Sequence, residues 1–250
     1  SNLAHRLLQR YTRVGATETE VSLRASQEAT LALVDTLGHL YRAGSMFSQG
    51  ARASYRGQIG RQAAIPHAMA TNASFMAGDV LVTGASSGVG AAAARRFVRR
   101  GAKVIMVARS ADKLSELAAD IGFGAIPAPC DAADPDAVAK LAAEGIAEHG
   151  VPDVIVNSAG AGSWKAVPET TPQEAVSMMQ APYFAAFNVT QAFLPAMLER
   201  DSGIIIHVNS PACIAAWPKS AGYTAARAAL LGFHRALAQD LAGTGVESCH

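Results

Sequence analysis

Three side chains in the last third of the chain are of types that can perform acid–base chemistry at a carbonyl group. Tyr223 and Arg227 lie four residues apart in a helical stretch, so they share one helix face, and Ser210 stands at the end of the preceding strand. A phenol titrates near ~10 and exchanges protons poorly at neutral pH unless a cation stabilises the phenolate. Tyr, Ser and a fixed positive charge therefore make a workable site for carbonyl reduction, although the pair also fits a packed Tyr and a solvated Arg.

A glycine-rich turn is the most informative stretch of the chain. An apolar strand, residues 80–83, ends in a turn that contains Gly84, Gly88 and Gly90, and an Ala-rich amphipathic segment, residues 91–100, follows directly. Glycine lets backbone N–H groups approach a phosphate closely, and the partial positive charge of a helix N-terminus favours anions. Strand, turn and helix together predict a dinucleotide site.

Two charged residues that follow later strands are placed to contact such a ligand. Arg109 comes 19 residues after Gly90, where an acidic residue would hold the ribose 2′-hydroxyl and an Arg accommodates a 2′-phosphate. The sequence therefore favours NADP(H) over NAD, with a solvated surface Arg as the alternative. Asp131, just past the third strand, either accepts a hydrogen bond from the adenine amine or caps the next turn.

Short apolar strands and helical stretches alternate from Asp79 onward. Several strands are continuous apolar runs, as strands buried on both faces require. The alternation predicts an α/β fold, a Rossmann-like doubly wound parallel sheet with helices on both faces and ligands at the carboxyl ends of its strands. We expect strands at 80–83, 103–108, 125–130, 153–157 and 204–209, a sixth able to start at Val246, and helices at 90–100, 111–121, 135–149, 172–198 and 221–241, the fourth broken or kinked near Pro168, Pro172 and Pro182.

The composition changes at Asp79, which divides the chain into residues 1–78 and a dinucleotide-binding domain over residues 79–250. The first part contains eight Arg, no Lys and four acidic residues, and residues 20–41 have the apolar spacing of an amphipathic helix. We expect a partly helical N-terminal extension that packs on the main domain or on a second subunit. A remnant of an organelle targeting segment is the alternative.

Composition limits the classes of partner. Half of the 250 residues are hydrophobic, 16% are charged and the net charge is +1, which is typical of a globular protein and gives no basis for a nucleic-acid partner. No apolar run approaches the ~20 residues of a membrane helix. Three dispersed cysteines fit a reducing compartment and provide neither a disulfide framework nor a metal cage. We therefore expect a cytoplasmic protein, with an organelle as the alternative if residues 1–78 are a targeting remnant.

In their order along residues 79–250, these motifs resemble the short-chain dehydrogenase/reductase family. The turn from Thr83 to Gly90 is similar to the family's TGxxxGxG element, and residues 157–160 are similar to its NNAG element. Asp131 resembles the acid that contacts adenine. Ser210 precedes Tyr223 by 13 residues, as the family's substrate-orienting Ser precedes its catalytic Tyr.

The resemblance implies a role for each matched residue. Tyr223 would be the general acid in reduction and the base in oxidation, and Ser210 would hold the carbonyl oxygen of a small-molecule substrate. Arg227 would supply the positive charge that stabilises the phenolate of Tyr223. It also implies a homodimer or homotetramer formed through the two long helices. The residues expected to bind NADP(H) are Thr83, Gly84, Ser86, Ser87, Gly88, Val89, Gly90, Arg109, Asp131, Asn157, Ala159, Gly160, Tyr223 and Arg227.

The chain departs from the family pattern in three places. Arg227 replaces the Lys of the YxxxK motif, and its guanidinium would meet the nicotinamide ribose differently from an ammonium. The family's helix Asn falls on Pro182, which cannot position the water of a proton relay, and Gln180 and Asn188 are the nearest amides. The sequence also ends at His250, where the family continues into a substrate loop and a last strand.

Two functions therefore remain open on the sequence. The first is an NADP(H)-dependent oxidoreductase that interconverts a carbonyl and an alcohol. The second is a catalytically weak or inactive dinucleotide-binding protein, acting as a sensor or a structural subunit. Trp164, Trp217 and the pair Met178 and Met179 either line an apolar substrate pocket or belong to the core or an interface.

Overall fold

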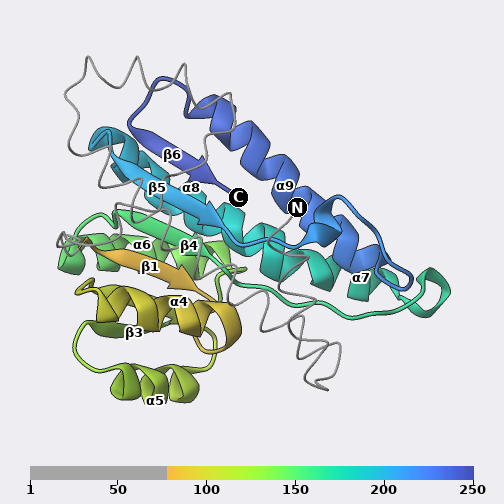
Figure 1. The fold of residues 1–250 in the computed structure, drawn as a ribbon, viewed down its shortest axis with the longest axis horizontal. Helices are drawn as coiled ribbons and strands as arrows, with labels where there is room; N and C mark the ends of the chain where they lie inside the picture. Colours follow the sequence, from red (N-terminus) through yellow and green to blue (C-terminus); the bar gives the residue numbers. More distant parts are fainter. Residues whose placement is uncertain (1–77) are drawn as a thin grey trace, which may run out of the picture. The chain divides into compact units, whose positions relative to one another are not determined.

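The computed structural model describes residues 78–250, so the expected N-terminal extension lies outside the described residues. Strands and helices alternate along this part of the chain (Figure 1). The strands are β1 (Val80–Thr83), β2 (Val104–Ala108), β3 (Ala125–Pro129), β4 (Val154–Asn157), β5 (Gly203–His207) and β6 (Val246–Cys249). The α-helices are α4 (Gly88–Arg99), α5 (Ala111–Ile121), α6 (Pro135–His149), α7 (Pro172–Met179), α8 (Ala185–Glu199) and α9 (Ala221–Asp240).

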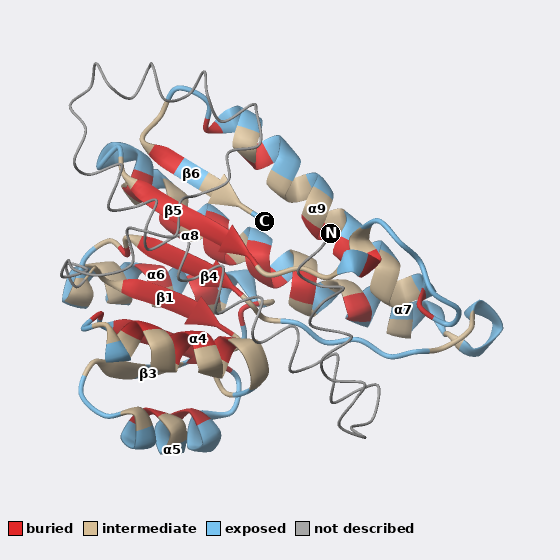
Figure 2. Ribbon diagram, in the orientation of Figure 1, coloured by how far each residue is buried: buried red, intermediate tan, exposed pale blue. Residues whose placement is uncertain are grey.

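The strands form one parallel six-stranded sheet in the order β3-β2-β1-β4-β5-β6. Strand order reverses between β1 and β4, which is the topological switch point where such sheets bind ligands. Every residue of β1, β2, β4 and β5 is buried, which explains their continuous apolar runs (Figure 2). The predicted Rossmann-like doubly wound fold is confirmed.

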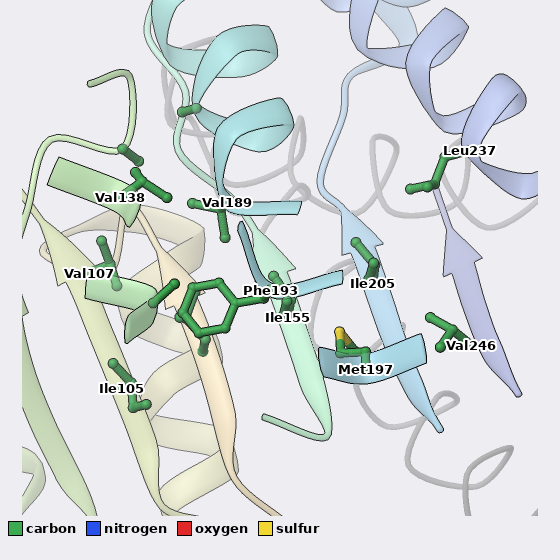
Figure 3. Packing of buried hydrophobic residues seen from close by; sticks show 14 of the residues in the cluster. Ile105, Val107, Val138, Ile155, Val189, Phe193, Met197, Ile205, Leu237 and Val246 are labelled. Carbon is green, nitrogen blue, oxygen red and sulfur yellow. The ribbon is translucent and has the colours of Figure 1, made fainter. Parts of the chain in front are cut away.

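Side chains alternate between the two faces of the sheet, so each face has its own helix layer. One layer is a single cluster in which α6, α8 and α9 cover the sheet (Figure 3). Phe193 and Met197 of α8 pack there with Ile155 and Ile205, and Leu237 of α9 packs at the same face. The other layer consists of α4 and α5, which pack against β1, β2 and β3. These layers fix the carboxyl ends of the strands as a common edge for the loops of the site.

The predicted fourth helix is three consecutive elements. Pro172 starts α7 instead of breaking it, since the first helical position needs no N–H donor. A π-helical segment, η4 (Gln180–Phe184), then holds the buried Pro182, and α8 follows without a gap. Pro168 lies in a short 3-10 helix, η3 (Val167–Glu169). A mid-helix Pro removes one donor, and a wider turn accommodates that loss.

Other differences from the predicted elements are small. β5 ends at His207 instead of residue 209, and the sixth strand forms where it was expected, from Val246. Within residues 78–250, no helix is long and apolar enough to cross a membrane. In the same range, no group of three or more His, Cys, Asp and Glu side chains is arranged to hold a metal ion.

Candidate functional site

The glycine-rich turn after β1 is built around two contacts that exclude a side chain. Gly84 has φ +64°, and a Cβ there would lie 2.9 Å from the Cα of Ala159. A Cβ on Gly90, the third residue of α4, would overlap the carbonyl oxygen of Gly84. Gly88 has φ +55° with open space in front of it. The turn is therefore folded back on the start of the helix and has room for a ligand at its middle glycine.

The N-terminus of α4 offers backbone donors to that space. Ser87 is the N-cap with extended φ and ψ, and within the described part of the chain no side chain caps this end. The first turn of α4 also contains no acidic residue that would compete with an anion. Uncapped N–H groups and the helix dipole favour a phosphate here. The expected phosphate-binding residues lie here: Ser86 and Ser87 end the glycine-rich turn, and Gly88, Val89 and Gly90 begin α4.

Thr83 is buried and stabilises the loops of the site through hydrogen bonds. Its buried hydroxyl accepts hydrogen bonds from the backbone N–H of Ser158 and of Ala159, both at 3.1 Å. Ser158 in turn donates its hydroxyl to the carbonyl oxygen of Thr83. The expected cofactor residue Thr83 therefore connects the glycine-rich turn to the loop after β4, which continues through Gly160.

Arg109 and Asp131 both lie at the carboxyl edge of the sheet. Arg109 follows the last residue of β2 and is exposed. Asp131 follows β3 by two residues, is exposed, and accepts a hydrogen bond from the N–H of Ala133 at 3.0 Å. Asp131 thus caps the turn before α6 with one oxygen, and within residues 78–250 its second oxygen has no hydrogen-bond donor.

Asn157, the last residue of β4, directs its side chain into the core. Its Nδ2 donates to the hydroxyl of Thr190 at 3.3 Å and lies 3.5 Å from Nδ1 of His207. All three residues are buried. Burial lowers the pKa of His207 to about 3, with smaller contributions from His234 and His250. The side chain of Asn157 therefore supports the sheet, and the NNAG-like stretch reaches the ligand edge through Ala159 and Gly160.

Tyr223 and Arg227 come together on the first turns of α9. The guanidinium carbon of Arg227 lies 5.0 Å from the centroid of the Tyr223 ring, within the range of a cation–π contact. Arg227 is 9% exposed and donates from Nη1 to the carbonyl oxygen of Val208 at 3.1 Å. A Cβ on Gly160 would lie 2.6 Å from Nη2 of Arg227. The buried cation is thus fixed between the phenol ring, the end of β5 and the loop after β4.

Ser210 lies on the loop after β5 and is linked to α9 through its neighbour Asn209. It is the N-cap of a short 3-10 helix, η5 (Pro211–Cys213), which packs against α9. Its hydroxyl accepts from the N–H of Ala212 at 3.3 Å, and its own N–H donates to Oδ1 of Asn209. The Asn209 side chain also donates to the carbonyl oxygen of Arg227 at 3.0 Å. Among the described residues the Ser210 hydroxyl has no acceptor, so its hydrogen can donate to a ligand.

The amides nearest to Pro182 do not replace the Asn that the resemblance places there. Asn188 donates its Nδ2 to the carbonyl oxygen of Ala132 at 3.2 Å, which fixes it to the loop before α6. Gln180 is exposed at the start of η4. Pro182 itself is buried and has no N–H.

Sequence reasoning missed how the loops after β4 and β5 lie against Tyr223. A Cβ on Gly162 would overlap the Tyr223 ring, and the ring of Trp164 lies 5.7 Å from it, centroid to centroid. Trp217, on the loop after β5, lies 6.4 Å from Trp164. The repeated glycines at 160 and 162, beside the NNAG-like stretch, were the available signal for a close backbone approach.

Comparisons with known proteins show which family this chain resembles. The family model of short chain dehydrogenases matches residues 79–249. A short chain dehydrogenase of Pseudocercospora fijiensis is 35% identical over 175 residues, covering 67% of this chain and 56% of that protein. Serine 3-dehydrogenase of Agrobacterium fabrum is 35% identical over 177 residues, covering 68% and 69%. A metagenomic short-chain oxidoreductase solved with NADP has a TM-score of 0.66 at 34% identity, covering 68% of this chain and 79% of that one.

The match lies on the part of the chain that carries the fold and the site. The chain spans about half the length of several curated relatives that it matches, from 47% to 56%. The matched residues include the glycine-rich turn, the switch point of the sheet and the Tyr223 region. The chain belongs to the short-chain dehydrogenase family of oxidoreductases, whose members bind a nicotinamide dinucleotide.

Proposed function

We propose that residues 79–250 form the dinucleotide-binding domain of an NADP(H)-dependent oxidoreductase that interconverts a carbonyl and an alcohol. The observation that carries this proposal is the buried guanidinium of Arg227 beside the Tyr223 ring, 5.0 Å from its centroid, at the ligand edge of the sheet. A permanent cation next to a phenol makes that phenol a usable proton donor and acceptor.

The residues present fit a dinucleotide. The backbone N–H groups of Gly88, Val89 and Gly90 would hold the pyrophosphate, because the open side of Gly88 and the uncapped start of α4 leave room and donors there. Exposed Arg109 would pair with a 2′-phosphate, and the free oxygen of Asp131 would accept from the adenine amine. The ligand edge near Gly160 would then receive the nicotinamide end.

A bound nicotinamide supplies hydride in reduction and accepts it in oxidation. Tyr223 gives its hydroxyl proton to the substrate oxygen in reduction and takes it back in oxidation. Ser210 donates its hydroxyl hydrogen to the same oxygen and orients the carbonyl. Arg227 stabilises the phenolate left on Tyr223, and its bond to the carbonyl oxygen of Val208 holds the charge in place. Because Pro182 offers no side-chain donor, the proton returns to Tyr223 without an amide side chain at that position.

The test is NADPH oxidation with a panel of carbonyl compounds by the wild type and the variant Tyr223→Phe. We expect turnover to fall by a factor of about 10² to 10⁴, typical for loss of a general acid, while NADPH binding is retained. Tyr183→Phe is the matched control, because Tyr183 contacts Phe184, Phe187 and Phe233 rather than the Tyr223 region. Unchanged turnover in Tyr223→Phe would remove the assigned acid.

A second candidate function is a dinucleotide-binding protein with little or no catalysis. It is favoured by the buried Pro182 in η4 and by the hydrogen bond of Asn188 to Ala132, because neither residue then offers a free amide to a proton relay. This candidate predicts tight NADPH binding without hydride transfer to any carbonyl in the panel. Sustained turnover by the wild type would eliminate it.

We further propose that the protein is a homodimer or homotetramer. Four aromatic residues from η4, α8 and α9 form one contact group: Tyr183, Phe184, Phe187 and Phe233. Phe184 is 39% exposed and Phe187 is 41% exposed, so the group reaches the surface of residues 78–250. Grouped exposed aromatics favour burial against a second subunit. A monomeric mass by light scattering at micromolar concentration would contradict the assignment.

A further inference from the structure

The loops after β4 and β5 are joined into one structure beyond the ends of their strands. Lys165 and Ser220 form a parallel β-bridge between them. Lys165 also forms an ion pair with Glu174 of α7, which neutralises its positive charge. Figure 1 shows the two loops running together beyond the carboxyl ends of β4 and β5, near the start of α9. Side chains on either loop are therefore held relative to each other.

The loop after β5 places Trp217 by a tight turn. The backbone N–H of Ser220 donates to the carbonyl oxygen of Trp217 at 3.2 Å, and the Ser220 hydroxyl donates to the same oxygen at 2.6 Å. The N–H of Trp217 donates back to that hydroxyl at 3.0 Å. Pro218 and Lys219 are the central residues, and Lys219 has φ +63°, a conformation that non-glycine residues rarely adopt. The turn therefore contains one strained residue, Lys219, and its three hydrogen bonds fix the backbone of Trp217.

Trp164 lies next to the proposed proton donor, Trp217 lies next to Trp164, and both rings remain accessible. Trp164 lies 5.7 Å from the Tyr223 ring at an interplanar angle of 31°, and 6.4 Å from Trp217 at 59°. Trp164 is 57% exposed and Trp217 is 45% exposed. Core Trp residues are largely buried, so two half-exposed indoles on the same pair of loops are placed to contact something other than the core.

We propose that Trp164 and Trp217 form an aromatic wall that binds the group attached to the carbonyl carbon. The site then prefers aryl or conjugated planar carbonyl compounds to small hydroxylated ones. This inference rests on the proposed function, since it assigns Tyr223 as the proton donor at the same site. Ile214, four residues after Ser210 and 79% exposed, adds apolar surface to the same loop. Indole faces gain most from flat apolar groups, and they give a small polyol no specific partner.

The test compares acetophenone with hydroxyacetone as substrates of the NADPH-saturated full chain. We expect Trp164→Ala and Trp217→Ala each to raise KM for acetophenone about tenfold, while kcat and the KM for hydroxyacetone change less than about threefold. Trp164→Phe and Trp217→Phe should restore most of the acetophenone KM, because the aromatic face is kept. Equal KM changes for both probes would overturn the wall. A fall in kcat for both probes would also overturn it, since Trp164 would then only position Tyr223.

A binding readout separates this inference from the proposed function. The sequence contains two Trp, so intrinsic Trp fluorescence reports on the wall alone. We expect acetophenone to quench this fluorescence in the NADPH complex of Tyr223→Phe, which should not turn over, and hydroxyacetone to leave it unchanged. Absence of quenching by acetophenone overturns the wall. Quenching in a wild type that reduces neither these probes nor any other carbonyl of the panel supports the wall and overturns the carbonyl reductase assignment.

Discussion

Substituting His207 tests how far a buried neutral imidazole sets the acid stability of this fold. His207 is fully buried at the end of β5, and its ring packs edge-on against Phe233 at 5.4 Å, centroid to centroid. Burial is the main cause that lowers its pKa from 6.5 to about 3, and the charges of His234 and His250 lower it further. The folded protein therefore keeps this ring neutral at pH values where the unfolded chain protonates it.

The sign of the effect follows from this difference in proton binding. Between about pH 6.5 and pH 3 the unfolded state binds the additional proton, so the free energy of unfolding falls as the pH falls. At 1.36 kcal/mol per pH unit, the whole interval corresponds to a loss of about 5 kcal/mol. Typical domains are stable by about 5 to 15 kcal/mol, so we expect a loss of this order to be measurable.

Urea unfolding followed by circular dichroism between pH 7 and pH 4.5 measures the effect. We expect the free energy of unfolding of the wild type to fall more steeply than that of His207→Gln, by about 1 kcal/mol per pH unit below pH 6. Thr190→Val is the control, because it removes the hydrogen bond to Asn157 without removing the imidazole. It should lower stability at every pH with the slope of the wild type. Equal slopes for the wild type and His207→Gln would refute the reasoning.

Variants at Gly90, Arg109 and Arg227, with two controls, test the ligand site. Gly90→Ala should abolish NADPH binding measured by calorimetry, because its Cβ overlaps the carbonyl oxygen of Gly84. Gly145→Ala in α6 is the control, because there is open space around Gly145. This control should bind NADPH normally and gain about 0.5 to 1 kcal/mol of stability. Arg109→Asp should raise Kd for NADPH about tenfold or more and leave Kd for NADH lower than that for NADPH. Arg227→Met should reduce kcat at least about a hundredfold, because it removes the cation beside the Tyr223 ring. Arg227→Lys keeps the charge, so its kcat should stay within about tenfold of the wild type. Equal losses of kcat in both variants would show that Arg227 does not act through its charge.

The fold could be predicted because its signals are local and repeated. Continuous apolar runs such as those of β2 and β5 identify buried parallel strands, and the glycines after Thr83 identify the first crossover. Helix periodicity in residues 172–198 indicated helix and could not resolve the π-helical turn at Pro182, since hydrogen-bond spacing depends on how η4 packs against α9. The strand ends differ from the predicted ones by one or two residues, because the hydrogen bonds that end a strand depend on its neighbours in the sheet.

The candidate site was predicted in its residue types and less well in its contacts. Spacing on one helix placed Tyr223 beside Arg227, but nothing local shows that the cation is held by the carbonyl oxygen of Val208. Asn157 matched a motif, yet its side chain lies in the core, because the last position of β4 faces α8. Contacts between loops far apart in sequence, such as Lys165 with Ser220, depend on the assembled sheet.

The hydroxyl of Thr83 has a consequence for how cofactor preference can be changed. Its buried oxygen accepts hydrogen bonds from two backbone amides of the loop after β4. Under the proposed function, this link would set the span between the pyrophosphate end and the nicotinamide end of the ligand. If Arg109 contacts the ribose as proposed, its replacement should leave the hydride geometry unaltered, provided that Thr83 is retained. Replacing it with an isosteric Val would change both ends together, even though every ligand-facing group stayed the same.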